Sequence, residues 1–141
     1  VVAQRLGLYP TVCCSYGTKE LGRHSGVALA ALLAGRLKGP IVMAHAGGAK
    51  LMDAMLVAAD SPNVFLDTSF SLDYYLGSSL EGDMAFAMRK LGASRWMFGS
   101  DAPFFPQKTS IRQILEFFRK HRFRAREAEE ILSGTARRIL G

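Results

Sequence analysis

Four short apolar runs alternate with helix-forming segments along this chain, and this alternation limits its possible folds more than any other feature. The runs are centred on Val12, Val42, Phe65 and Met97, which lie 30, 23 and 32 residues apart. Each interval accommodates a strand, a returning helix and two connections, so the pattern predicts βαβ units in a parallel sheet. Right-handed crossovers would bring the carboxyl ends of all four strands to one edge.

We expect strands over residues 8–15, 41–44, 64–68 and 95–99, and helices over residues 25–37, 49–60, 80–91, 110–120 and 126–140. The strands are apolar throughout rather than alternating, as expected when both faces of a sheet are covered. The segment 69–79 is polar and aromatic, which favours a loop. Hydrophobic residues make up 49% of the sequence, which excludes a disordered chain. No linker divides it, so we predict one α/β domain over residues 1–141.

Polar side chains follow the predicted strands at the shared edge. His45 comes directly after the second strand and is followed by Gly47 and Gly48, and Asp101 follows the fourth strand. An imidazole and a carboxylate that meet there can hold a zinc-type ion or relay a proton to a bound water. Alternatively, His45 is a structural histidine and Asp101 only caps the following turn. Asp67, at the end of the third strand, is expected to have a turn or capping role.

The cysteines and the charge limit the surroundings and the partners of the chain. Cys13 and Cys14 are adjacent and are the only cysteines; a disulfide between them would be strained, so we expect two reduced thiols in a cytoplasmic protein. The net charge of +6 permits an anionic substrate or a nucleic acid. The basic run at residues 119–126 is typical of a solvated turn, so we do not expect a nucleic-acid partner. No apolar run reaches ~18 residues, so we expect no membrane partner.

Four segments together are similar to a known family: IVMAHAGG at residues 41–48, PNVFLDTS at 62–69, RWMFGSDAP at 95–103 and ILSGTARRILG at 131–141. In this order they resemble the C-terminal half of the amidohydrolase-related family. That family is the branch of the metal-dependent hydrolase superfamily that includes aromatic-acid decarboxylases and lactone hydrolases. Thr135 stands where the family usually has Asn. The resemblance implies a TIM-type (β/α)8 barrel, of which this chain supplies strands five to eight.

The resemblance also implies roles for individual residues. Asp101 matches the strand-eight Asp, which binds the metal and handles the proton of the attacking water. His45 matches the strand-six His, which contacts the substrate or polarises its reacting group. Where the family has a strand-five His, this chain offers Cys14, which can ligate zinc as a thiolate, or Ser15; His24 lies further on. We therefore expect a divalent metal, zinc in particular, and the family's strand-one His-x-His lies outside this sequence.

These observations predict a metal-dependent hydrolase or non-oxidative decarboxylase. Its substrate would be a small carboxylated or cyclic molecule, contacted by Gly47, Gly48 and Phe104. The alternative is a non-catalytic α/β module that has lost its metal ligands and serves in packing or partner binding. Four parallel strands cannot close into a barrel and leave two edges unpaired. We therefore expect either the missing N-terminal half of the barrel or a homo-oligomer to complete the structure.

Overall fold

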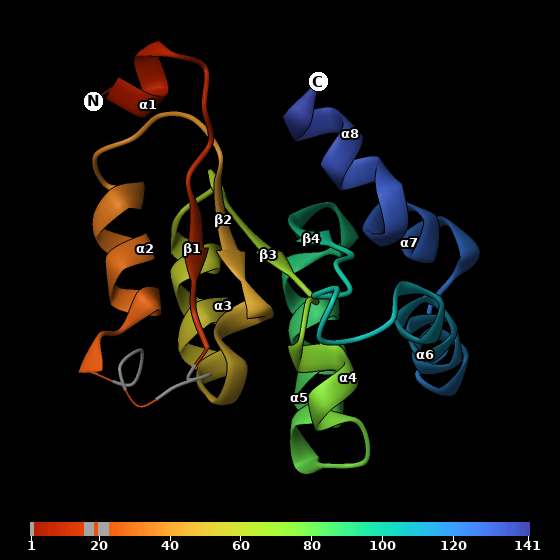
Figure 1. The fold of residues 1–141 in the computed structure, drawn as a ribbon. Helices are drawn as coiled ribbons and strands as arrows, with labels where there is room; N and C mark the ends of the chain where they lie inside the picture. The colour runs from red at the N-terminus through yellow and green to blue at the C-terminus, as the bar shows by residue number, and fades with distance from the viewer. Residues whose placement is uncertain (1, 16–18, 20–22) are drawn as a thin grey trace.

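The computed structural model of the chain is a parallel α/β structure. It describes residues 2–15, 19 and 23–141; positions 1, 16–18 and 20–22 of the predicted domain lie outside the described residues. Four parallel strands form one sheet in the order β1-β2-β3-β4 (Figure 1). Their bounds are β1 Thr11–Cys13, β2 Ile41–Ala44, β3 Val64–Asp67 and β4 Trp96–Met97. The predicted parallel α/β class is confirmed.

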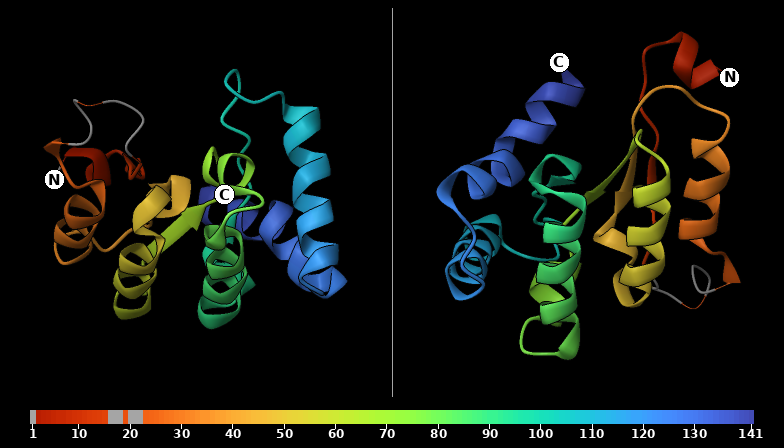
Figure 2. Two further views of the ribbon diagram at one scale, coloured as in Figure 1. Left: turned by 90° about the horizontal axis from the view of Figure 1, so that it is seen from below. Right: turned by 180° about the vertical axis from the view of Figure 1, so that it is seen from behind.

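Helices connect the strands and continue after the last one. Their bounds are α1 Val2–Arg5, α2 Gly26–Ala34, α3 Leu51–Asp60, α4 Ser71–Tyr75, α5 Ser79–Leu91, α6 Gln107–Lys120, α7 Ala125–Glu129 and α8 Thr135–Leu140. Seen from behind, α2, α3 and α5 lie side by side over one face of the sheet (Figure 2). Shorter 3-10 turns, η2 at His45–Lys50 and η3 at Ala93–Arg95, and a π turn, η4 at Glu130–Gly134, complete the chain. No helix among the described residues is both long and apolar enough to cross a bilayer.

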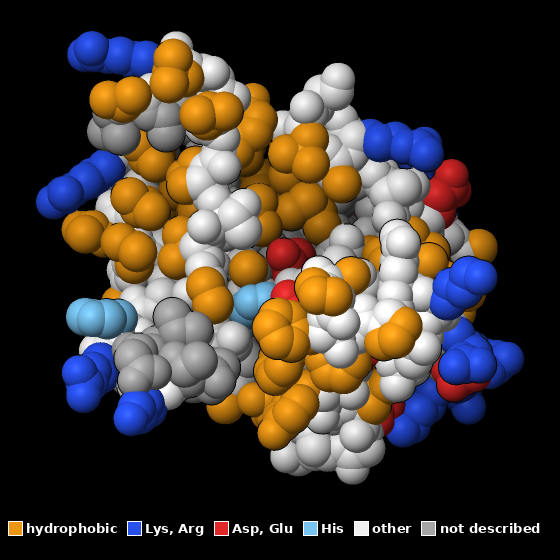
Figure 3. Space-filling view, in the orientation of Figure 1, with side chains coloured by type: hydrophobic (Ala, Val, Ile, Leu, Met, Phe, Trp, Pro, Cys, Tyr) orange, Lys and Arg blue, Asp and Glu red, His pale blue; other side chains and the backbone are white. Residues whose placement is uncertain are grey.

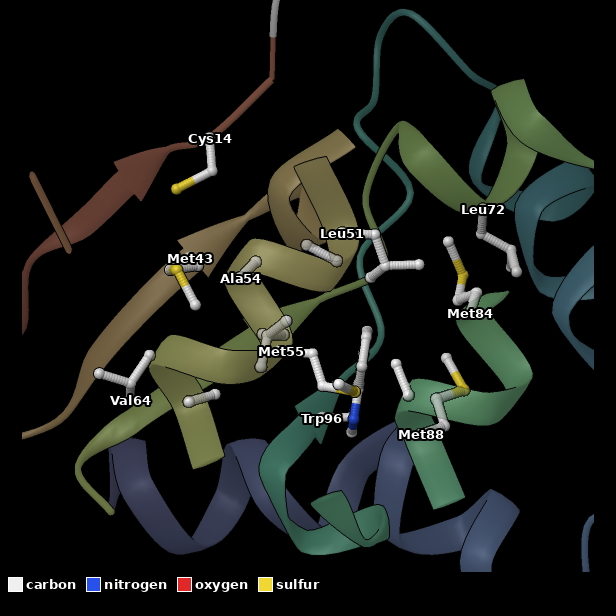
Figure 4. Close-up of a cluster of buried hydrophobic side chains, with 14 of the residues drawn as sticks. Cys14, Met43, Leu51, Ala54, Met55, Val64, Leu72, Met84, Met88 and Trp96 are labelled. Atoms are coloured by element: carbon white, nitrogen blue, oxygen red, sulfur yellow. The ribbon is translucent and has the colours of Figure 1, made fainter. Parts of the chain in front are cut away.

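The core lies between the sheet and this helical layer. Val12, Met43, Leu66 and Trp96 are level with one another across the four strands, and all four are buried. Figure 4 shows strand and helix side chains meeting in this cluster, among them Met43, Val64, Trp96, Leu51, Ala54, Met55, Met84 and Met88. Met55, Met84 and Met88 are thus core residues, since their flexible thioethers fill the space between the helices and the sheet.

The opposite face of the sheet is covered only in part. Val42, Phe65 and Met97 form a second small cluster there, against which Ala136 and Ile139 of α8 pack. On β1, by contrast, Thr11 and Cys13 are exposed, while Val12 between them is buried. Hydrophobic side chains gather over this face (Figure 3). The expectation that both faces are covered is therefore wrong for β1 in this chain, because no described element packs over its second face.

The segment 69–79 is not simply a loop, because it contains the short helix α4. Ser71 and Leu72 at its start are buried, and the Ser71 hydroxyl donates a 2.5 Å hydrogen bond to the carbonyl of His45. Leu72 belongs to the core. Tertiary contacts stabilise this helix, and five residues are too few to show a helical period in the sequence.

The predicted helix at residues 126–140 is continuous in path but irregular. It consists of α7, the π turn η4 and α8. Buried Ile131 lies in the π turn, and its carbonyl accepts a 2.9 Å hydrogen bond from the backbone N–H of Phe98 just after β4. This contact ties the last helical segment to the strand that precedes Asp101.

Candidate active site at the carboxyl edge of the sheet

His45 is held at the carboxyl end of β2 by its backbone. The strand ends at Ala44, and the next four residues, 45–48, all have positive φ. The N–H of His45 donates a 2.9 Å hydrogen bond to Oδ1 of Asp67, at the end of the neighbouring strand β3. This bond holds the sharp turn of the chain after β2, so the imidazole leaves the sheet in a defined direction.

The ring of His45 has partners on the segment that follows β3. Its Nδ1 atom lies 2.9 Å from the hydroxyl and 3.1 Å from the carbonyl oxygen of Ser69. The ring of Phe70 meets it edge-on, with 5.9 Å between centroids. One ring nitrogen is thus engaged by the protein, and one side of the ring is bounded by an aromatic group.

Asp67 organises this end of the sheet. Its Oδ1 accepts hydrogen bonds from the N–H of His45 and the N–H of Ser69, both at 2.9 Å, and a short one from the Ser69 hydroxyl. The bond to the Ser69 N–H is the local turn interaction predicted for Asp67. Sequence reasoning missed the bond to His45, although the pairing of Met43 with Leu66 brings the ends of these two strands level.

Gly47 and Gly48 are required by the packing of the chain itself. A Cβ atom on Gly47 would come within 2.7 Å of the Ala54 side chain on α3. One on Gly48 would lie 3.3 Å from Cβ of Ser15, beyond the end of β1. Both residues also have positive φ, which glycine adopts without strain. Close packing inside the protein thus explains both glycines, and their predicted contact with a substrate stays a prediction.

Asp101 lies at the same edge, beyond the end of β4. Gly99 is fastened to the end of β3, since its N–H donates a 3.2 Å hydrogen bond to the Thr68 hydroxyl. Asp101 is half-buried and has a φ of 64°, and its carbonyl accepts a 2.9 Å hydrogen bond from the N–H of Phe104. One strand lies between β2 and β4, which corresponds to about 10 Å between their backbones. His45 and Asp101 therefore share the predicted edge.

Aromatic rings line the surroundings of His45, but they are not the ones expected. Phe70 stacks on Tyr74 at 4.8 Å and meets Phe105 at 5.8 Å between centroids. Phe104, the predicted pocket residue, is 81% exposed. Sequence reasoning selected Phe104 and missed Phe70, whose position depends on a φ of 58° that no sequence pattern reveals.

The predicted ligand Cys14 is unsuited to metal binding in this structure. It is buried in the core, and its thiol donates a 3.2 Å hydrogen bond to the carbonyl of Val12. Burial, with smaller contributions from Cys13 and Asp67, raises the pKa of the Cys14 thiol from 9.0 to about 12, so the thiolate that zinc would need is disfavoured. His24 is exposed on the far side of the undescribed positions 20–22.

The remaining donors do not form a complete metal site. A structural or catalytic zinc ion takes three or four protein ligands. Over residues 2–15, 19 and 23–141, no three His, Cys, Asp or Glu side chains lie together so as to hold an ion. Asp101 fits the role of one ligand by its carboxylate chemistry and its half-exposed position. The other ligands would have to come from outside these residues.

The comparisons with known proteins agree with this geometry. A family model described as amidohydrolase matches residues 2–141. The chain belongs to the amidohydrolase family. The resemblance inferred from the four sequence segments is therefore confirmed. No match is found among curated proteins.

Solved structures place this amidohydrolase chain within a barrel fold. An uncharacterized TIM-barrel protein from Bordetella bronchiseptica has a TM-score of 0.77 at 20% identity, with 99% of this chain and 47% of that one covered. A zinc-bound amidohydrolase from Burkholderia multivorans scores 0.69 at 18% identity, covering 98% and 54%. A manganese-bound dihydroxybenzoic acid decarboxylase from Polaromonas scores 0.63 at 15% identity, covering 97% and 51%. The predicted partial barrel is confirmed, and the chain spans about half the length of these proteins.

The larger grooves bordered by described residues lie away from this edge of the amidohydrolase chain. One, of about 770 Å³, lies between η3 and the segment from α7 to α8, and neither His45 nor Asp101 lines it. Another has a volume of about 510 Å³ and runs between the start of α5 and α6. Its lining includes Gly77, Glu81, Phe117 and Lys120, and does not include His45 or Asp101. Groove size therefore does not identify the chemical site here, and the candidate site is defined by its side chains.

Proposed function

We propose that this chain is the carboxyl-terminal half of a metal-dependent hydrolase or non-oxidative decarboxylase. The observation that supports this most is that His45 and Asp101 follow different strands of an amidohydrolase-family sheet and share its carboxyl edge. Enzymes built on parallel (β/α) barrels keep their chemistry at that edge. Because the chain spans about half the length of its structural neighbours, the complete activity belongs to a protein that also contains the rest of the barrel.

The proposed cofactor is a divalent metal ion, zinc first, with Asp101 as one of its ligands. The solved neighbours include one protein with bound zinc and one with bound manganese, which supports a divalent ion. When bound, such an ion lowers the pKa of water and polarises a substrate oxygen. The carboxylate of Asp101 would accept the proton of the attacking water, and the imidazole of His45 would face the reacting group and stabilise its developing charge.

The proposed substrate is a small carboxylated or cyclic molecule, and the rings near His45 favour an aromatic one. Phe70, Tyr74 and Phe105 form a contiguous aromatic surface beside the imidazole. Aromatic rings stack against flat apolar surfaces of this kind. Among the similar structures is a 2,6-dihydroxybenzoate decarboxylase complexed with 2,6-dihydroxybenzoate. Non-oxidative decarboxylation of a hydroxylated benzoate is therefore the first reaction to test, and lactone hydrolysis is the second.

The competing proposal is a non-catalytic module that has lost its metal ligands. The observation that favours it is Cys14, which is buried and protonated near the position where the family resemblance implies a histidine. The two proposals differ in whether the full-length protein retains a bound metal ion.

The test is metal analysis and activity measurement on the full-length protein. We expect about one equivalent of zinc or manganese per chain. We also expect carbon dioxide release from a dihydroxybenzoate or hydrolysis of a lactone. Asp101→Ala should lose the metal and lower the activity by about 100-fold or more. Asp60→Ala is the control, because Asp60 is an exposed carboxylate at the end of α3. A full-length protein that binds no divalent metal, or an Asp101→Ala variant with unchanged metal content and activity, would overturn the proposal.

A further inference from the structure

Ser69 lies between the ring of His45 and the carboxylate of Asp67. Its hydroxyl oxygen is 2.9 Å from Nδ1 of His45 and makes a short hydrogen bond to Oδ1 of Asp67. Its carbonyl oxygen is 3.1 Å from the same Nδ1. Ser69 is 7% exposed, so water has little access to these contacts. The three side chains form a chain of hydrogen bonds from β3 to the end of β2.

The chemistry of the three partners determines which group donates and which accepts in each of these hydrogen bonds. A carbonyl oxygen only accepts, so the contact between Nδ1 and the carbonyl of Ser69 requires a proton on Nδ1. Oδ1 of Asp67 already accepts two backbone N–H groups, as an ionised carboxylate does. The Ser69 hydroxyl therefore donates its proton to Asp67, and its oxygen is left to accept from His45.

We propose that Ser69, held by Asp67, fixes the neutral ring of His45 as the Nδ1–H tautomer. In the other tautomer the Nδ1 lone pair would face the carbonyl oxygen of Ser69. The Ser69 hydroxyl could then donate to Nδ1 of His45 or to Oδ1 of Asp67, but not to both. Loss of a partly buried hydrogen bond of this kind disfavours that tautomer by about tenfold or more. Asp67 and Ser69 are thus positioning residues that act through His45.

The consequence for the candidate site is that Nε2 of the neutral ring carries the free lone pair. Nε2 can then accept a proton from a substrate hydroxyl, and the imidazolium formed in this way can stabilise developing negative charge, while Nδ1 keeps its proton in both charge states. The bonds to Ser69 and Asp67 therefore need not rearrange during that transfer. This meaning for catalysis rests on the proposed function, whereas the tautomer itself is a property of the folded chain.

The experiment is nitrogen NMR of the histidine rings in the full-length protein, uniformly labelled with nitrogen-15. At a pH where the ring is neutral, we expect Nδ1 of His45 to resonate as a protonated, pyrrole-type nitrogen and Nε2 as a pyridine-type nitrogen. Exposed His24 in the same spectrum serves as an internal reference. In Ser69→Ala the backbone carbonyl still accepts from Nδ1 but the hydroxyl contact is lost, so the two His45 signals should shift part of the way toward each other as the Nε2–H form becomes populated. Asp67→Asn should give a smaller shift in the same direction.

Two controls keep the result interpretable. Ser79→Ala removes an exposed hydroxyl at the start of α5 and should leave the His45 signals unchanged. Thermal unfolding of each variant checks that the fold persists, and Asp67→Asn provides the test if Ser69→Ala does not fold. A wild-type ring protonated on Nε2, or folded variants with unchanged His45 signals, would overturn the inference. The measurement needs neither metal nor substrate, so an inactive protein would refute the proposed function without affecting this result.

Discussion

The two edges of the sheet are built from the same four strands, but they differ in backbone conformation and in the hydrogen bonds that side chains make. At the amino edge, the guanidinium of Arg95 donates to the carbonyls of Ala58 and Ser61 at 2.8 Å and also to that of Val64. Asn63 donates to two further carbonyls, those of Leu37 and Gly39. Side chains here satisfy backbone groups that the strands and helices leave open.

At the carboxyl edge the backbone itself is strained. The described part of the chain has five non-glycine residues with positive φ, and four of them lie here: His45, Ala46, Phe70 and Asp101. Each such conformation costs about 1 kcal/mol and persists only where the surrounding contacts hold it. The two candidate catalytic residues are both in this set. The comparison indicates that contacts at the amino edge stabilise the fold. At the carboxyl edge, strained backbone conformations orient side chains at a cost in stability.

The largest effect should come from breaking the amino edge. Arg95→Ala removes the hydrogen bonds that join β4 to the end of α3 and the start of β3, and it leaves partly buried carbonyls without partners. Burial lowers the pKa of Arg95, but the guanidinium stays charged, and hydrogen bonds from charged donors are strong. We expect a loss of about 3 kcal/mol in the free energy of unfolding, measured with urea on the full-length protein.

Arg95→Lys is the matched control for that experiment. Lysine keeps the charge but cannot reproduce the planar fork of donors, so we expect it to recover less than half of the loss. If Arg95→Ala unfolds at the same urea concentration as the wild type, the amino edge is not the stabilising region.

Low pH should have an intermediate effect on the free energy of unfolding. This effect should arise from protonation of Glu81 on α5. Lys120 donates a hydrogen bond to this buried carboxylate, and Gly77 in the connection after α4 donates another at 2.8 Å. The Lys120 bond is the main reason that the pKa of Glu81 is lowered from 4.5 to about 2. A carboxyl group with a lowered folded pKa stabilises the fold above its unfolded pKa. That contribution is lost as the pH falls from about 4.5 towards 2.

We expect this loss to be roughly 2 kcal/mol, less than the full shift implies, because the Lys120 side chain is 63% exposed and solvent screens the pair. Urea unfolding between pH 5 and pH 2 measures it. Glu81→Gln should flatten the slope in this range, while variants at Arg95 should keep it. An equal slope in Glu81→Gln and wild type would mean that other carboxylates control acid stability.

The sequence predicts the amino-side architecture better than the site, and single residues show why. The strand 41–44 is predicted with its observed bounds, because four apolar residues between turn signals leave few alternatives. The placement of His45 and Asp101 at one edge follows from topology alone. The alternation of side chains along β1 could also have shown that Cys14 is not a metal ligand. Cys14 lies two residues after buried Val12, so it points to the same helix-covered side of the sheet.

Contacts that depend on backbone angles could not be predicted in the same way. The bond from Asp67 to His45 requires the register of β2 and β3 and a left-handed residue after the strand. Phe70, rather than Phe104, faces His45 because its own φ is positive. Local sequence patterns carry periodicity and turn propensity, but they do not specify which aromatic side chain a strained turn will direct inward.

The smallest expected change in the free energy of unfolding is also the most direct test of backbone strain at the carboxyl edge. Asp101 has a φ of 64°, a conformation that glycine adopts without strain, so Asp101→Gly should raise the free energy of unfolding by about 0.5 kcal/mol. Glycine in place of Glu116, an exposed residue inside α6, should lower it by about 0.5–1 kcal/mol, because glycine weakens the interior of a helix. Urea unfolding of both variants measures the two signs. A loss of stability in Asp101→Gly would mean that its carboxylate supports the fold, and that the strain at this edge is not held there for the side chain's chemistry.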